Sequence, residues 1–208
     1  MPDKRLLSIL PPPLLCAEAL TLAFDGQPPL FGPLSFAIGP GLSLVRGGDG
    51  RGKSSLLRLL AGRLAPSSGR LQRTAATLWD EDINEADQQT VAAAWLAAQR
   101  ARHAGWDRAA EPALLTALGL DEHLAKPLYM HSMGSRRKVG LAGALLSGAA
   151  LTLIDMPFAA LDARSIRVLC EQLAQQAQAG QRALVIADYA LPAALQAQPL
   201  AALIELGD

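Results

Sequence analysis

The sequence predicts an α/β fold with a mainly parallel sheet, and three observations support this prediction. Apolar runs of strand length alternate with stretches of helical spacing along most of the chain. A glycine-rich segment, residues 47–52, separates one apolar run from one helical stretch. A later apolar run, residues 151–155, ends in an aspartate, and polar groups at strand ends are typical of the ligand-binding edge of a parallel sheet.

The first part of the chain predicts strands and one helix. Residues 19–24 and 34–38 alternate apolar and polar side chains around turn-forming prolines, and residues 42–45 form a mostly apolar run. Residues 53–60 have helical spacing directly after the glycine-rich segment. A turn at residues 66–69 precedes two further strands. These strands are expected at residues 70–73 and 75–79.

Helical spacing dominates the middle of the chain. Helices are expected at residues 88–103, 111–118 and 135–146. We therefore expect a helical subdomain at about residues 83–146, inserted into a single domain that spans residues 1–208.

The last part of the chain returns to alternating strand and helix patterns. Residues 151–155 predict a buried strand, and residues 164–179 predict a helix that ends at Gly180. Residues 183–187 predict another strand. A strand, a helix and a strand in this order are typical of neighbouring parallel strands.

Composition limits the class of protein. Half of the 208 residues are hydrophobic, which is enough for a core, and the formal net charge is zero, so we expect no nucleic-acid partner. The two cysteines, Cys16 and Cys170, have no metal-ligand spacing. A reduced, cytoplasmic protein is therefore expected.

The sequence predicts no membrane-spanning helix. Residues 6–15 faintly resemble a secretion signal, but the prolines at positions 11–13 interrupt the apolar run, so a surface lead-in is expected. Residues 139–154 have helical spacing but fall short of the ~20 residues that cross a bilayer.

The glycine-rich segment fits the phosphate-binding pattern G-x-x-x-x-G-K-[ST]. Its glycines let backbone N–H groups turn toward an anion, Lys53 supplies charge to the β- and γ-phosphates, and the Ser54 hydroxyl can join a Mg²⁺ shell. A chance glycine turn is the alternative, which the flanking strand and helix disfavour. The candidate nucleotide-binding residues are Gly47, Gly48, Asp49, Gly50, Arg51, Gly52, Lys53, Ser54 and Ser55.

Asp155 is the candidate partner of Ser54 in binding Mg²⁺. A carboxylate at the carboxyl end of a buried strand lies where α/β sheets bind ligands, and beside a phosphate-binding loop it can hold the metal. Buried strands often end in aspartate without binding a metal. The phosphate-binding pattern earlier in the chain favours the metal site here.

Four segments, taken in order, resemble an ABC-type ATPase. The phosphate-binding pattern is the first segment, and residues 56–62 and 66–69 after it are similar to the family's first helix and the turn that follows. HSMGSRRK at residues 131–138 is similar to the family's LSGGQ signature and the basic residues after it. DMPFAALD at residues 155–162 is similar to the family's D-E-P-F-x-A-L-D. The resemblance covers residues 19–189 and implies a P-loop NTPase fold, in which an antiparallel β lobe and the helical subdomain accompany the mainly parallel sheet.

The resemblance implies roles for further residues. Phe24 lies where the family stacks an aromatic ring on adenine, with a place in the core as the alternative. Ser132 and Gly134 would reach the γ-phosphate held by a partner chain in a head-to-tail dimer, so a second nucleotide-binding chain, identical or different, is expected. Asp162 would belong to the dimer-contact loop, and the basic residues 136–138 are expected to form a solvated helix start.

Three positions depart from the family's pattern. Met156 stands where the family has a general-base glutamate, and a thioether cannot accept a proton from water. Asp188 aligns with the switch histidine, and its carboxylate would repel the γ-phosphate that the histidine contacts. Acidic residues 80–82 replace the family's glutamine loop. Hydrolysis is expected to be slow or absent, unless Asp188 or one of residues 80–82 supplies the missing base.

The resemblance implies an ATP-binding transporter subunit with ATP and Mg²⁺ as cofactors. Small single-domain members usually serve a separate membrane-spanning subunit, which implies a cytoplasmic location at the inner face of the cell membrane. The short length and the Pro157-Phe158 pair resemble the haem-export ATPases of cytochrome c maturation. The alternative is a non-transport, ATP-gated regulatory or scaffold protein of the same family. A GTPase is disfavoured because the only asparagine, Asn84, is not followed by lysine.

Three tryptophans lie in or near the helical insertion: Trp79, Trp95 and Trp106. Packing in the core of the subdomain is the expected role for such large side chains. The alternative is an exposed patch on which a membrane subunit docks.

Overall fold

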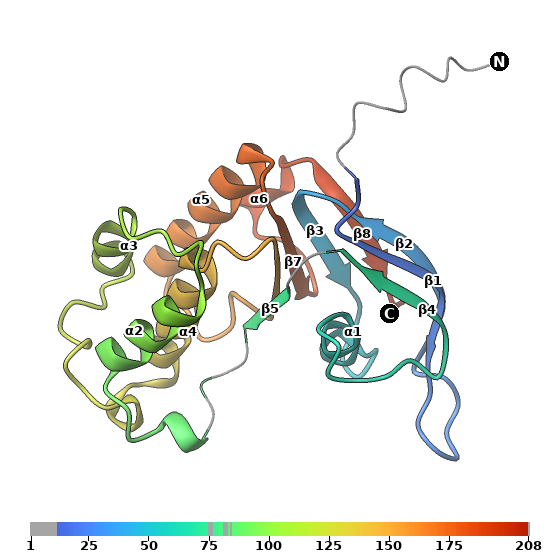
Figure 1. Ribbon diagram of the computed structural model, residues 1–208, viewed down its shortest axis with the longest axis horizontal. Helices are drawn as coiled ribbons and strands as arrows, with labels where there is room; N and C mark the ends of the chain where they lie inside the picture. Colours follow the sequence, from blue (N-terminus) through green and yellow to red (C-terminus); the bar gives the residue numbers. More distant parts are fainter. Residues whose placement is uncertain (1–11, 75–76, 81–82, 84, 208) are drawn as a thin grey trace.

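The computed structural model describes residues 12–74, 77–80, 83 and 85–207 and contains two sheets with helices around them (Figure 1). The three-stranded sheet has the order β2-β1-β4, and the five-stranded sheet has the order β5-β6-β7-β3-β8. The strands are β1 (Leu15–Leu22), β2 (Phe31–Ile38), β3 (Gly41–Arg46), β4 (Ser68–Arg73), β5 (Thr77–Asp80), β6 (Leu151–Asp155), β7 (Ala183–Asp188) and β8 (Leu200–Glu205). The helices are α1 (Lys53–Leu60), α2 (Ala92–Arg102), α3 (Glu111–Ala117), α4 (Met133–Leu146), α5 (Ala163–Ala179) and α6 (Ala193–Gln196), with short 3₁₀ helices at Glu85–Asp87 and Leu128–Met130.

The strands of the larger sheet run parallel, whereas β1 pairs antiparallel with both β2 and β4. Figure 1 shows the antiparallel sheet on one side of the larger sheet and helices α2, α3 and α4 on the other side. The predicted P-loop NTPase fold, with a mainly parallel sheet, an antiparallel β lobe and a set of helices, is therefore confirmed. The division into a single domain with an inserted subdomain at about residues 83–146 stays a prediction.

The larger sheet is buried on both faces because its strands carry apolar side chains at successive positions. On β7, Leu184 and Ile186 belong to one core cluster, together with residues of α2, α3, α4 and α5. Val185, next to both, belongs to the second cluster, together with residues of α1 and the antiparallel sheet. Since successive side chains of a strand point to opposite faces, one apolar strand stabilises both layers.

Two expected elements agree with the structure to the residue: the helix at residues 53–60 and the strand at residues 151–155. The helix expected to begin at residue 88 begins at Ala92 instead. Its first part pairs with a distant segment, because Leu128 N donates to Thr90 O at 2.9 Å and Tyr129 N donates to Gln88 O at 2.9 Å. These hydrogen bonds replace the helical ones over the same residues.

The ends of the sheets also differ from the expectation. Strand β1 begins at Leu15, four positions before the expected start, and a bulge at Ala19, which has φ of 47°, interrupts its pairing with β2. Strand β8 was not expected at all, and it forms the edge next to β3. Its apolar residues alternate only weakly, so pairing with β3 rather than local pattern determines the strand.

Two of the three tryptophans pack inside the protein, as expected. Trp106 is buried, and its Nε1 donates to Glu111 Oε2 at 2.8 Å. Trp95 packs on the same core cluster, with its ring beside Gly143 of α4. Trp79 belongs to β5, and its side chain lies outside the described part of the chain.

Several expectations concern residues that the structure does not describe. Residues 6–11 of the surface lead-in expected at residues 6–15, and two of the acidic residues, Glu81 and Asp82, lie outside the described ranges. The end of the expected lead-in is not on the surface, because Leu15 begins β1 and is fully buried. Among the described residues, no helix is long and apolar enough to cross a membrane.

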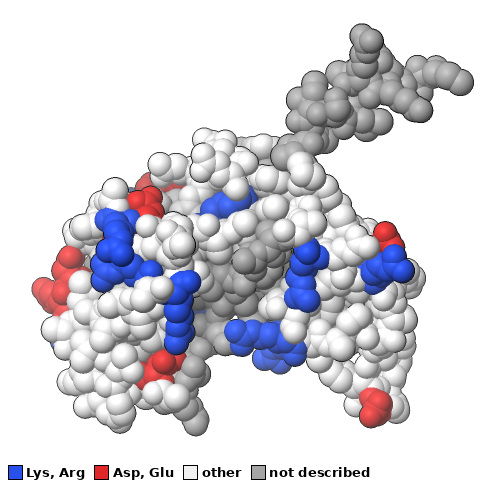
Figure 2. Space-filling model, viewed as in Figure 1, with Lys and Arg blue, Asp and Glu red and all other residues white. Residues whose placement is uncertain are grey.

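Figure 2 shows Lys and Arg side chains in separate groups over one face rather than in a continuous band.

Candidate nucleotide-binding site

The phosphate loop, residues 47–55, leads from β3 into α1 at the carboxyl edge of the parallel sheet. Gly50 and Gly52 have φ of 73° and 92°, values that side-chain-bearing residues rarely adopt. A Cβ on Gly52 would also lie 2.8 Å from the side chain of Leu30. Gly47 serves a different purpose, since its Cβ would lie 3.1 Å from Gly207 O and the C-terminal segment packs on the loop there.

The N-terminus of α1 is open to an anion. Gly52 is the N-cap residue, no described side chain caps the helix, and its first turn contains no acidic residue. The first N–H groups of a helix have no partner within the helix, and the helix dipole favours negative charge at that end. The end of α1 therefore has the properties of a phosphate-binding site.

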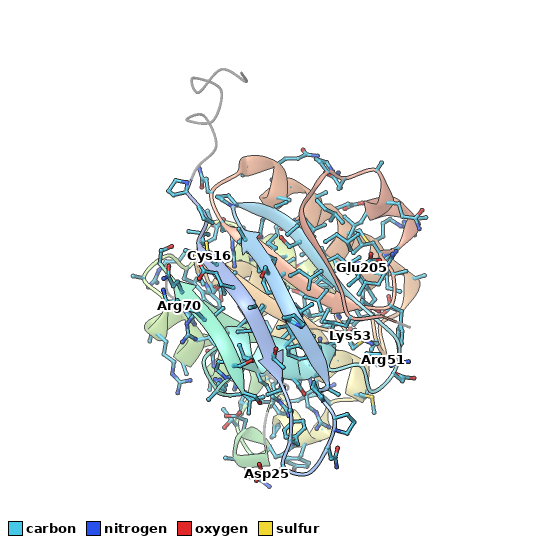
Figure 3. The ribbon with its side chains drawn as sticks, turned by 90° about the vertical axis from the view of Figure 1, so that its right-hand side faces the viewer. Cys16, Asp25, Arg51, Lys53, Arg70 and Glu205 are labelled. Atoms are coloured by element: carbon cyan, nitrogen blue, oxygen red, sulfur yellow. The ribbon has the colours of Figure 1, made fainter. Side chains whose placement is uncertain are left out.

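Lys53 is held against the loop rather than extended into water. Its Nζ donates to Gly47 O at 2.7 Å and to Gly48 O at 2.8 Å, and the residue is only 7% exposed. Figure 3 shows Lys53 and Arg51 on the same side of the molecule as Glu205, away from Cys16 of β1 and Arg70 of β4. The ammonium group is thus fixed beside the backbone that would surround the phosphates.

Two aspartates lie at the ends of neighbouring strands next to the loop. Asp155 ends β6, Asp188 ends β7, and in the register Asp155 pairs with Ala187 while Arg46 of β3 pairs with Asp188. Asp155 Oδ1 is buried, and no described residue forms a hydrogen bond with it. An orphaned carboxylate oxygen at this position suits a metal ligand.

Ser54 and Asp155 fit a Mg²⁺ ion that is also held by phosphate. Among the described residues, no cluster of three or more His, Cys, Asp or Glu side chains could hold a metal by itself. Mg²⁺ is usually bound by one or two protein groups together with substrate phosphates and water, so a larger cluster is not required.

Asp188 is buried at 8% exposure, and its Oδ1 accepts a hydrogen bond from Tyr189 N at 2.7 Å. Burial raises the pKa of this carboxyl group, and the Asp155 charge raises it further. The Tyr189 N–H and the Lys53 charge act in the opposite direction on the same pKa. The Asp188 carboxylate therefore already accepts a hydrogen bond from the backbone of the next residue, although it lies close to both Lys53 and Asp155.

Met156, at the expected general-base position, has a strained backbone with φ of 45°. Its N–H donates to Ala187 O at 2.9 Å, which continues the pairing of β6 with β7 beyond Asp155. Strain of this kind is common at functional sites. Met156 therefore has an unusual backbone conformation directly after Asp155, but its thioether provides no proton acceptor.

The signature helix begins earlier than expected. α4 starts at Met133 because Ser132 is its N-cap, with Ser132 Oγ accepting a hydrogen bond from Ser135 N at 3.1 Å. Gly134 packs on its own chain, since a Cβ there would lie 2.5 Å from Ala160 O. A contact of Ser132 and Gly134 with a partner's nucleotide stays a prediction.

The expectation of a solvated basic helix start at residues 136–138 is wrong. Arg137 donates to Asp155 O, Arg136 Nη2 donates to His131 O at 3.5 Å, and Lys138 Nζ donates to Asp162 Oδ2 at 2.6 Å. All three residues are half-buried. Arg137 and Lys138 thus bind α4 to the end of β6 and to the segment after it, whereas Arg136 binds the residue before the N-cap of α4.

Phe24 lies in the turn after β1, next to Asp25 (Figure 3), and is 47% exposed. The core alternative for this ring is therefore wrong, because a core phenylalanine would be buried. An exposed ring can stack on a base. Adenine stacking by Phe24 stays a prediction.

Tyr189 is the residue that the sequence analysis overlooked. Its hydroxyl donates to Asp49 of the phosphate loop, and its ring lies 4.1 Å from Lys53 Nζ. A polar aromatic residue directly after a strand that ends at the site could have identified it. Its distance along the chain from the loop hid the contact.

Comparisons with known proteins agree with the fold and the loop. The model of a family described as ABC transporter matches residues 32–159. A cytochrome c biogenesis ATP-binding export protein, CcmA, of Xylella fastidiosa is 35% identical over 180 residues, which cover 81% of this chain and 80% of that protein. CcmA of Zymomonas mobilis is 33% identical over 196 residues, which cover 92% and 85%.

A relative with a different description is similar at the same level. The cobalt import ATP-binding protein CbiO of Rhodobacter capsulatus is 34% identical over 170 residues, which cover 72% of this chain and 61% of that protein. Similarity at this level therefore extends to proteins described for different cargoes.

Solved structures resemble the fold. The structure of an ATP-binding subunit of an ABC transporter has a TM-score of 0.73 at 21% identity, with coverage of 84% of this chain and 79% of that chain. A putative ABC transporter ATP-binding protein from Pyrococcus furiosus has a TM-score of 0.71 at 20% identity, with coverage of 92% and 96%.

Proposed function

The chain belongs to the ABC transporter family, as an ATP-binding domain, and from this membership we propose that it binds Mg-ATP on the phosphate loop, residues 47–55. One observation carries the proposal. The uncapped N-terminus of α1 follows a loop in which Gly50 and Gly52 adopt left-handed conformations, and the Lys53 ammonium is fixed on the carbonyl oxygens of that loop. This combination suits a polyphosphate.

Each part of the loop has a separate role in this proposal. The N–H groups of the loop and of the first turn of α1 donate to the phosphate oxygens, and Lys53 neutralises charge on the β- and γ-phosphates. Ser54 and Asp155 hold Mg²⁺, which supplies positive charge to the phosphate oxygens and orients them. Phe24 stacks on the adenine ring, which its exposure allows.

We further propose that hydrolysis is slow. Met156 directly follows Asp155 at the end of β6, but its side chain has no group that accepts a proton. The loss of a general base typically costs ~10²–10⁴-fold in rate. The chain therefore acts mainly through ATP-dependent association, in which Ser132 and Gly134 of each chain reach the γ-phosphate on the other in a head-to-tail dimer. The partner chain is a second copy or a related subunit.

The proposed setting is a transporter complex at the inner face of the cell membrane, where a separate membrane-spanning subunit carries the pathway. The CcmA relatives are described as export proteins of cytochrome c biogenesis, so we propose export in that process, with haem as the cargo that the family resemblance implies. The CbiO relative is described for cobalt import, so the cargo needs its own test. Co-purification with a multi-spanning protein favours transport, whereas ATP-dependent dimerisation without one favours the regulatory alternative.

Calorimetric titration of the full chain with Mg-ATP tests the binding proposal, and size-exclusion chromatography with and without Mg-ATP tests dimerisation. We expect saturable binding that Lys53→Ala weakens by at least about tenfold, because a charge-assisted contact with the phosphates is lost. Arg70→Ala on the far side of the molecule is the matched control and is expected to change affinity by less than about twofold. Absence of Mg-ATP binding by the wild-type chain would contradict the proposal.

A further inference from the structure

Two consecutive polar residues follow the apolar part of β7, and they have different surroundings. Asp188 is 8% exposed and accepts a hydrogen bond from the Tyr189 N–H. Tyr189 is 46% exposed, and its side chain extends to the phosphate loop. The residue directly after β7 therefore contacts the loop through its side chain.

Two contacts define where the Tyr189 side chain lies. Its hydroxyl donates to the Asp49 carboxylate, in the middle of the phosphate loop. Its ring lies 4.1 Å from Lys53 Nζ, the ammonium that serves the β- and γ-phosphates in this loop type. A side chain with both contacts lies beside the place where the terminal phosphate of a bound nucleotide has to be.

We propose that Tyr189, which directly follows β7, contacts the terminal phosphate in place of Asp188, with its hydroxyl as the hydrogen-bond donor. This inference rests on the proposed function of the same loop. A phenol hydroxyl is neutral and donates a hydrogen bond, whereas an ionised carboxylate only accepts one and repels phosphate. Tyr189 thus provides what Asp188 at the aligned position lacks.

In this proposal, the Tyr189 hydroxyl changes its hydrogen-bond acceptor when a nucleotide binds. In the structure, the Tyr189 hydroxyl donates to Asp49. The hydrogen bond with Asp49 raises the pKa of the Tyr189 hydroxyl. When a nucleotide enters, a phosphate oxygen replaces the Asp49 carboxylate as the acceptor. The Tyr189 hydroxyl therefore has one acceptor in the structure, the Asp49 carboxylate, and another in the proposed ATP complex, an oxygen of the terminal phosphate.

The test compares the affinities of Mg-ATP and Mg-ADP for the full-length chain by calorimetric titration. Tyr189→Phe removes the hydroxyl, and with it both the hydrogen bond with Asp49 and the proposed contact with the terminal phosphate. ADP has no terminal phosphate and leaves the contact with Asp49 in place, so the ratio of the two affinities reports what the Tyr189 hydroxyl gains from the terminal phosphate. We expect the preference for ATP over ADP to decrease by about tenfold, the size of one hydrogen bond to a charged group.

Two further variants serve as controls. Tyr129→Phe changes the other tyrosine of the chain, which is also exposed, and is expected to leave the ratio within about twofold. Tyr189→His keeps a donor at the position and is expected to retain most of the preference for ATP. Thermal melts of all variants establish that each remains folded.

Three outcomes would overturn the inference. If the wild-type chain binds ATP and Tyr189→Phe leaves the ratio unchanged, the inference fails while the proposed function stands. If Asp188→Asn lowers the ratio and Tyr189→Phe does not, Asp188 makes the contact. If the wild-type chain binds neither nucleotide, the proposed function and the inference both fail.

Discussion

Lys138 Nζ lies 2.6 Å from Asp162 Oδ2, and this ion pair joins the signature helix α4 to the N-cap of α5. Asp162 also accepts a hydrogen bond from Ser165 N at 2.8 Å, which caps the helix. The Lys138 ammonium and the Ser165 N–H hold the pKa of the Asp162 carboxyl group well below its usual range. One carboxylate thus fixes both helices that flank the Met156 segment.

The two roles of Asp162 can be separated by substitution. Asp162→Ala removes the cap and the ion pair, and we expect the free energy of unfolding to decrease by about 1 kcal/mol or more, mostly from the cap. Asp162→Asn keeps a capping side chain and removes the charge, so its cost is expected to be about 0–1 kcal/mol, because the side chain is largely exposed. Urea denaturation at neutral pH measures both.

The same carboxylate predicts a dependence of stability on pH. Its pKa is lower in the folded chain than the value of about 3.9 in the unfolded chain, so its stabilising contribution is fully present above that value. The contribution decreases as the pH falls below about 4 toward the folded pKa. Between pH 5 and pH 3 (approximately the range around the unfolded pKa), Asp162→Asn is expected to lose less stability than wild type. Equal slopes for both proteins would contradict this origin.

Met156→Glu is expected to raise the rate of ATP hydrolysis by at least about tenfold, because the carboxylate can accept the proton of the attacking water. Met156→Gln is the matched control, since glutamine has the same size and hydrogen-bonding reach but is not a base. Phosphate release under saturating Mg-ATP measures both.

The alternative source of a base has its own result. Brisk wild-type hydrolysis that Asp188→Ala abolishes, together with no gain from Met156→Glu, would mean that Asp188 supplies the base. The position of Asp188 near Lys53 and Asp155 makes this outcome worth measuring in the same assay.

Arg182, a buried arginine, binds the C-terminal end of α4. Its guanidinium donates to Ala144 O at 3.1 Å, to Leu145 O at 2.9 Å and to Thr152 of β6. Burial lowers the pKa of Arg182 to about 10, so the group remains charged at neutral pH and complements the negative end of the helix.

Arg182→Ala is expected to lower the free energy of unfolding by about 3 kcal/mol, because buried carbonyl groups lose their partners. Arg167→Ala, on the same helix side of the sheet but exposed on α5, is the matched control with an expected change within about 0.5 kcal/mol. Urea denaturation followed by circular dichroism measures the difference. Similar midpoints for the two variants would show that Arg182 is dispensable.

Gly134→Ala is expected to destabilise the chain by about 1–3 kcal/mol, since the new Cβ would lie 2.5 Å from Ala160 O and one backbone would have to move. Gly39→Ala is the matched control, because its Cβ would meet no atom within 4 Å, and its effect is expected to stay within about 1 kcal/mol of wild type. Thermal denaturation compares the two. A Gly134→Ala protein as stable as wild type would remove the steric reason for glycine at this position.

Local patterns predicted the parts of the site that are local in the chain. The helix at residues 53–60 and the strand at residues 151–155 have the predicted bounds, because periodicity and a terminal glycine or aspartate suffice to define them. The phosphate loop was likewise predicted as a unit from its spacing. Such features depend on neighbours within a few positions.

Tertiary contacts decided what the patterns could not. β8 exists because it pairs with β3, residues 88–90 pair with residues 128–129 instead of extending α2, and Arg137 and Lys138 bind oxygen atoms of Asp155 and Asp162. The side chain of Phe24 is exposed although its type suits a core equally well. Apart from the exposure of Phe24, each outcome depends on a partner far away in the sequence.

By itself, the sequence determined the α/β fold, its family and a loop that suits a phosphate group, because all three follow from motifs of a few consecutive residues. Only the tertiary structure decided which side chain at the end of β7, that of its last residue or that of the next residue, extends to that loop. Asp188 and Tyr189 are adjacent, so their side chains leave the strand in different directions, and the fold buries the first and extends the second to Asp49.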